Sequence, residues 1–280
     1  MVHYKPVSII FFNALLAIFG ILTTTFESHL PDLLLPIIYG FAIFGAAILI
    51  SWGAEASEKD ISGAFVIALI ALIAVLPEYS IESILAYTAG KSYKNNNFTY
   101  TDRVGYVSAN VTGANRLLAG LGWPLIMLIN LYRNNKEINI TENNKLELVI
   151  IFAGLASMTL TFILDMQPLI MSAILICIYL FYLYVSSKKE SEEPEFVGIS
   201  KYITEFKKPV RITINVSLIV FSAISIFVVS HPFVESLIHV GEKFGIDEYY
   251  LIQWLAPLAS ESPEILIASL FAFRNKSIES

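Results

Sequence analysis

Residues 72–89, LIAVLPEYSIESILAYTA, and residues 255–273, LAPLASESPEILIASLFAF, decide the fold. Each is a long apolar run with a proline-glutamate pair inside it, which places Glu78 in the first run and Glu264 in the second. About 20 apolar residues are enough to cross the hydrocarbon core of a membrane as a helix. The whole chain is also apolar, since 56% of its 280 residues are hydrophobic, 15% are charged and the mean hydropathy is +0.66. The sequence therefore predicts an all-α integral membrane protein.

Apolar runs of similar length recur along the chain. They lack the period-2 alternation of an outer-membrane barrel, so a polytopic helical bundle is the architecture that satisfies the backbone hydrogen bonds in lipid. We expect about eight transmembrane helices, at residues 6–25, 33–53, 62–89, 104–131, 146–164, 168–186, 211–230 and 249–273.

The links between these runs carry lysine and arginine unevenly. With a cytoplasmic N-terminus, most of the 18 Lys and Arg residues fall on the cytoplasmic side, which is the distribution that the positive-inside rule favours. The stretch from Lys188 to Lys208 is the one break in composition, rich in Lys and Glu, and is typical of a solvated cytoplasmic linker between two membrane halves. No cleavable signal is visible, which is compatible with a plasma membrane.

Charge, cysteine count and motifs exclude several classes of function. A net charge of −6 leaves no basic face for DNA or RNA, so no nucleic-acid partner is expected. The single cysteine, Cys177, excludes internal disulfides and thiolate metal clusters. The chain has no HExxH motif and no Ser/His/Asp grouping within its apolar runs, so we expect neither an enzyme nor a bound cofactor.

Glu78 and Glu264 are the unusual residues, because a charged group at mid-membrane costs about 2.5–3.5 kcal/mol on insertion scales. A bound cation is the partner that best offsets this cost. The preceding proline removes a backbone donor and frees carbonyl oxygens, and calcium prefers a cage of oxygen ligands. A functionless kink whose glutamate is protonated or paired is the alternative, but no lysine lies inside a span and Arg116 can neutralise only one glutamate.

Further oxygen ligands lie close in sequence. Glu82 follows Glu78 by one helical turn, while Ser260 and Glu261 precede Glu264. The glycine-bearing run 104–131 adds amide oxygens, from Asn110 and Asn115, which could equally form hydrogen bonds between helices. We therefore predict a metal site made of Glu78, Glu264, Asn110, Asn115, Glu261, Ser260 and Glu82.

The repeated Pro-Glu motif also predicts two inverted repeats, with the site between them. We expect an extra N-terminal helix and link at 1–32, a first repeat at 33–186, a linker at 187–210 and a partial second repeat at 211–280. The second repeat is incomplete, since no counterpart of the asparagine-bearing run follows Glu264. We expect the chain to be a fragment of a longer polypeptide; the alternative is that a second chain in a homo-oligomer supplies the missing helices.

Laid out in this way, the sequence resembles the cation/calcium exchanger superfamily over roughly residues 33–280. The resemblance rests on residues 53–55 (GAE), 74–78 (AVLPE), 109–115 (ANVTGAN) and 259–264 (ASESPE). It implies that Glu78 and Glu264 are the central calcium-coordinating acids, shared in alternation with the counter-ion. The chain departs from the family pattern at the Thr-Ser pair that typically donates sodium ligands, which reads Ala74-Val75 in the first motif and Ser260-Glu261 in the second.

These departures leave the counter-ion open between sodium and protons, because the extra acids Glu82 and Glu261 suit proton exchange. We expect a secondary antiporter that exchanges calcium, or a related cation, by alternating access across the lipid bilayer. A cation channel or a membrane scaffold that transports nothing is the alternative.

Overall fold

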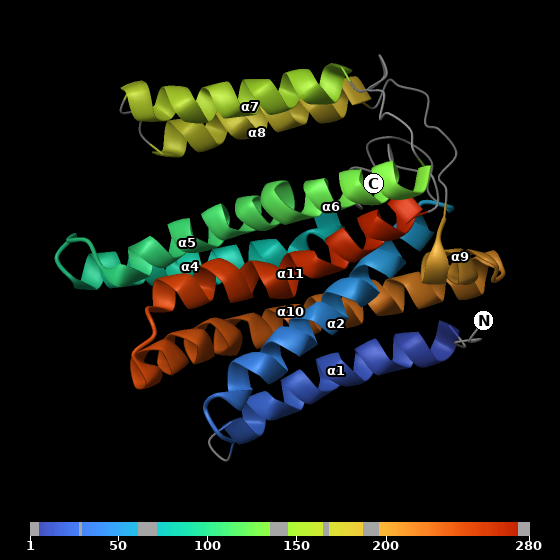
Figure 1. Ribbon diagram of the computed structural model, residues 1–280, viewed down its shortest axis with the longest axis horizontal. Coiled ribbons are helices and arrows are strands. Elements are labelled where there is room, and N and C mark those ends of the chain that lie inside the picture. Colours follow the sequence, from blue (N-terminus) through green and yellow to red (C-terminus); the bar gives the residue numbers. More distant parts are fainter. Residues whose placement is uncertain are drawn as a thin grey trace.

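The computed structural model describes residues 6–27, 30–60, 72–134, 145–164, 168–186 and 196–273, and this part of the chain is all-helical (Figure 1). Its elements are α1 (Pro6–Phe26), α2 (Leu34–Ser57), α4 (Leu76–Asn95), α5 (Asp102–Leu117), the π-helical turn η2 (Leu118–Gly122), α6 (Trp123–Asn134), α7 (Lys145–Leu164), α8 (Pro168–Ser186), α9 (Gly198–Thr204), α10 (Lys208–Phe244) and α11 (Glu248–Phe273). The prediction of an all-α bundle is confirmed for these residues.

Within the described residues, four helical stretches are long and apolar enough to cross a membrane. They are Pro6–Phe26, Leu34–Ser57, Asp102–Tyr132 and Lys208–Phe244. The stretch Asp102–Tyr132 joins α5, η2 and α6 into one uninterrupted helix, as expected for the run 104–131. The full set of eight spans stays a prediction.

Two of the expected spans have different boundaries in the structure. The run 62–89 is not one continuous helix in its described part, because a turn at Val75 separates helical residues 72–74 from α4; residues 61–71 lie outside the described residues. The span expected at 211–230 is too short, since α10 extends over 37 residues and accommodates Pro232. α10 ends where Gly245 adopts the left-handed conformation (φ 67°) that a glycine tolerates without steric cost.

The linker expected to be solvated is partly packed. Residues 187–195 lie outside the described residues, but α9 follows them and buries Val197, Ser200 and Ile203. Its end is also held by a hydrogen bond from Lys59 Nζ to the carbonyl oxygen of Thr204, at 2.7 Å. The linker was predicted to be solvated because it is rich in Lys and Glu. A short helix such as α9 can nevertheless dock with only a few apolar residues.

α2 and α10 pack against each other and run antiparallel, because ion pairs join opposite ends of the two helices. At one end, Arg211 donates to both carboxylate oxygens of Asp60, at 2.7 and 2.5 Å, and both side chains are buried. At the other end, Lys243 contacts Asp32. α1 packs along this pair. The two ion pairs hold α2 and α10 in a fixed register.

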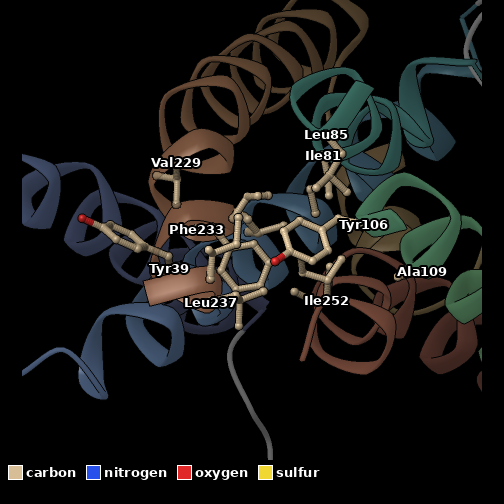
Figure 2. Packing of buried hydrophobic residues seen from close by; sticks show 14 of the residues in the cluster. Tyr39, Ile81, Leu85, Tyr106, Ala109, Val229, Phe233, Leu237 and Ile252 are labelled. Carbon is tan, nitrogen blue, oxygen red and sulfur yellow. The ribbon is translucent and has the colours of Figure 1, made fainter. Parts of the chain in front are cut away.

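The main hydrophobic cluster joins the α2–α10 pair to α4, α5 and α11. Figure 2 shows Phe233 of α10 at its centre, close to Tyr106 of α5, Ile252 of α11 and Leu237. Ile81 and Leu85 of α4, which follow Glu78 along the helix, also belong to it, among others. The cluster therefore packs the acid-bearing segments of α4 and α11 against the rest of the bundle.

The end of α2 carries a carboxyl group that titrates near neutral pH. Burial, together with the nearby carboxyl group of Glu55, raises the pKa of Glu58 to about 7. The folded chain then binds a proton that the unfolded chain has released, so this contribution to stability is present at low pH and is lost as the pH rises through about 7. We expect the melting temperature of the detergent-solubilised protein to fall between about pH 5 and about pH 8, and Glu58→Gln to flatten that fall. Thermal unfolding of both proteins over this range checks it; identical pH slopes would contradict the assignment.

Candidate cation site

Three carboxylates from two helices converge inside the bundle. One carboxylate oxygen each of Glu78 on α4, Glu261 on α11 and Glu264 on α11 lie within 4.8 Å of one another. Glu261 is buried, with 2% of its surface exposed, while Glu78 and Glu264 are half-buried. These residues were predicted from two distant parts of the chain, and the structure brings them together. We name this group the carboxylate triad.

Proline shapes the backbone on both sides of the triad, but in different ways. On α4, Pro77 lies directly after the turn at Val75, so Glu78 lies in the first turn of a new helix. On α11, Pro263 lies inside the helix. Because Pro263 has no N–H, the carbonyl oxygen of Ala259 loses its usual helical hydrogen bond one turn before Glu264. A ligand can use that oxygen.

One oxygen of the triad lacks a hydrogen-bond partner. Within the described part of the chain, Oε2 of Glu261 is buried and accepts no hydrogen bond. A buried carboxylate oxygen without a donor is costly, and a metal cation is one way to satisfy it. The oxygen-only ligands of the triad are those that hard divalent cations prefer.

The other predicted ligands lie around the triad at different distances. Glu82 is half-buried, one turn beyond Glu78, and is outside the group of mutually close carboxylates. The hydroxyl of Ser260 is buried and donates to the carbonyl oxygen of Ala256 at 3.2 Å. Asn110 is buried with Oδ1 unpaired within the described residues, whereas Asn115 is exposed.

Contacts between α5 and α11 show at which level the two asparagines lie. Tyr106 donates to Glu248 Oε2 at 3.3 Å, and Gly122 lies against Ile265 further along both helices. The two helices therefore run parallel, and the turn η2 lies level with the triad. Asn110 and Asn115 lie earlier, on either side of the contact between Gly113 and Gln253. The structure does not bring them to the triad as directly as their sequence pattern predicts.

Gln253 is a polar residue that the sequence analysis missed. It is buried, with 3% of its surface exposed, and its amide donates to Thr112 Oγ1 at 3.2 Å. Its spacing could have revealed it, because Gln253 precedes Glu264 by about three helical turns and therefore lies on the same face of α11.

Gly113 permits the close approach of α5 to α11 at this point. A methyl group added to Gly113 would lie 1.9 Å from the carbonyl oxygen of Gln253, which is far inside van der Waals contact with a backbone atom. We expect Gly113→Ala to lower the unfolding free energy by about 1–3 kcal/mol, the usual cost of overpacking. Gly90→Ala is the matched control, since a methyl group there meets nothing within 4 Å. Thermal unfolding of both variants checks the prediction, and equal melting temperatures would contradict it.

Comparison with known proteins decides the family. Residues 32–188, more than half of the chain, match the family model described as sodium/calcium exchanger protein. The chain belongs to the sodium/calcium exchanger family. This is a family of membrane transporters, not of enzymes, so the exchanger resemblance and the exclusion of an enzyme are both confirmed.

A solved structure supports this membership. This chain is similar to the crystal structure of the H+/Ca2+ exchanger CAX, with 30% sequence identity and a TM-score of 0.86. The match covers 98% of this chain and 68% of that one. No curated protein sequence matches the chain.

Proposed function

We propose that the chain is a secondary cation antiporter that exchanges calcium by alternating access around the carboxylate triad. The observation that carries the proposal is the convergence of Glu78, Glu261 and Glu264 from two helices far apart in sequence. Family membership supports cation antiport, and the oxygen-only ligands favour calcium over softer metals. Glu82, Ser260, Asn110 and Asn115 are proposed as outer ligands, or as oxygens through which the ion approaches.

Charge balance makes the exchange obligatory in this proposal. Three ionised carboxylates inside a membrane repel one another and are stable only when cations neutralise them. When calcium leaves, another cation must therefore take its place before the site can face the other side. A channel has no such requirement, because ions pass without a step in which the site is enclosed.

We propose protons as the counter-ion. Three carboxylates carry one negative charge more than calcium neutralises, so Glu261 adds a group able to hold a proton. Ala74 and Val75, in contrast, lack the hydroxyl groups that the family typically uses as sodium ligands. The similar solved structure is titled as an H+/Ca2+ exchanger, which supports the same choice.

The arrangement of helices supports two inverted repeats, at 33–186 and 211–280. α2 and α10, the first helices of the proposed repeats, are antiparallel. α4 and α5 are packed helices joined by a short connection, so they run antiparallel, and α5 runs parallel to α11. α4 and α11, which carry the two Pro-Glu motifs, therefore also run in opposite directions, as an inverted repeat requires.

We further propose that the protein resides in the plasma membrane with a cytoplasmic N-terminus. The distribution of Lys and Arg supports this orientation, because the end of the bundle with Lys59, Lys208 and Arg211 carries more of them than the opposite end. A homo-oligomer stays a prediction.

The test is uptake of radioactive calcium by proteoliposomes that contain the purified chain, driven in turn by a proton gradient and by a sodium gradient. We expect calcium uptake when the proton gradient is imposed, with protons moving in the direction opposite to calcium. We expect little uptake when the sodium gradient is imposed. Calcium uptake driven by the sodium gradient alone would overturn the assignment of protons as the counter-ion. Calcium flux that requires no counter-ion would favour a channel. No flux under either gradient would overturn the proposal for this chain.

A further inference from the structure

α5 and α11 meet at Gln253 through its side chain. The amide Nε2 donates to Thr112 Oγ1 at 3.2 Å, and the Thr112 hydroxyl in turn donates to the carbonyl oxygen of Ser108 at 2.6 Å. The donor and acceptor roles of the threonine are thus both used, so the Thr112 hydroxyl has a fixed direction. Gln253 is buried, where an unpaired amide would be costly.

The backbone of Gln253 forms a second contact with the same part of α5. Pro257 lies one turn later inside α11 and has no N–H, so the carbonyl oxygen of Gln253 lacks its usual helical donor. That oxygen lies against Gly113, where an added methyl group would be 1.9 Å away. The absence of a side chain at Gly113 is therefore needed for this approach, and Pro257 leaves the carbonyl oxygen that faces Gly113 without an intrahelical donor.

The two contacts differ from ordinary apolar packing in the membrane. Apolar side chains in a lipid environment provide little directional preference between helices, whereas a hydrogen bond and a close backbone approach define one register. α5 carries Asn110 and Asn115 and continues into the π-helical turn η2, and α11 carries Glu261 and Glu264. The register between these helices determines where the oxygens of α5 lie relative to the acids of α11.

We propose that Gln253 is a positioning residue, which fixes the register of α5 against α11 and thereby the geometry of the cation site. Gln253 does not touch the ion in this proposal; it acts through Thr112 and Gly113. The inference rests on the proposed antiport function, since it assigns to Gln253 a role in ion affinity.

The first experiment separates ion affinity from turnover. Calcium uptake is measured over a range of calcium concentrations for the wild type, Gln253→Leu, Thr112→Val and the double variant. Loss of this part-buried hydrogen bond, between the buried Gln253 and the exposed Thr112, is expected to raise KM for calcium about five- to tenfold, with kcat changed less than about twofold. The double variant should resemble either single variant, because both remove the same contact. Thr112→Ser keeps the hydroxyl and should retain the wild-type KM; a raised KM in Thr112→Ser, or effects that multiply in the double variant, would overturn the proposal.

The second experiment measures the register without transport. In a Cys177→Ser background, spin labels are placed at exposed positions through Leu121→Cys on η2 and Tyr250→Cys on α11. We expect one narrow distance distribution in the wild type and in Thr112→Ser, and a broader or shifted one in Gln253→Leu and Thr112→Val. Unchanged distributions in both disruptive variants would overturn the positioning role. If instead the distributions change but no variant and no wild-type protein transports calcium, the proposed function fails and the positioning of α5 stands.

Discussion

Glu78→Gln is expected to reduce calcium transport at least about 100-fold, because it removes a charged ligand from a site that is stable only with cations bound. The substitution keeps the size and the hydrogen-bonding shape of the side chain, so the helix turn at Pro77 should persist. Glu264→Gln should have the same effect, since one of its carboxylate oxygens, on α11, lies within 4.8 Å of one of Glu78. Initial rates of radioactive calcium uptake in proteoliposomes measure both.

Glu205→Gln is the matched control, because Glu205 is an exposed glutamate at the end of α9. Its uptake should equal that of the wild type. Full activity of either Glu78→Gln or Glu264→Gln, with normal expression and thermal stability, would show that the triad is not the transport site.

Arg211→Met is expected to lower the unfolding free energy by about 3–5 kcal/mol, because it leaves the buried carboxylate of Asp60 without a partner. Arg211 also donates to the carbonyl oxygens of Thr204 and Phe206, at 3.2 and 2.8 Å, so the same substitution removes two of the hydrogen bonds at the end of α9. The double variant Asp60→Leu with Arg211→Met should recover most of the loss, since it removes the unpaired charge as well. Thermal and chemical unfolding in detergent measure these variants; a double variant no more stable than Arg211→Met would contradict the ion-pair explanation.

The central acids could be predicted from the sequence because mid-membrane glutamates are so costly that they need a function. Glu78 and Glu264 were identified in this way, and Glu261 by its closeness to Glu264 in sequence; the structure brings the three together. The all-helical class could be predicted from the length of the apolar runs and from their lack of period-2 alternation. These features depend on local composition, which a single sequence records directly.

Other features depend on contacts between distant segments and could not be read in this way. The sequence pattern placed Asn110 with the acids, but the register of α5 against α11 is determined by Gly113 and Gln253, which lie on different helices. The length of α10 was underestimated because a window of about 20 apolar residues set the span at 211–230, whereas packing against α2 accompanies a helix that continues past Pro232 to Phe244. Likewise, the docking of α9 depends on Lys59, which lies 145 residues earlier in the sequence and donates to the carbonyl oxygen of Thr204.

Calcium binding to the purified protein, measured by isothermal titration calorimetry in detergent, tests most directly whether Glu78 and Glu264 share one ion. We predict one calcium ion per chain, with binding lost in Glu78→Gln and equally in Glu264→Gln, while Glu205→Gln binds as the wild type does. Binding that persists in both single variants, or a stoichiometry of two in which each variant loses only one ion, would contradict a single site formed between the two helices.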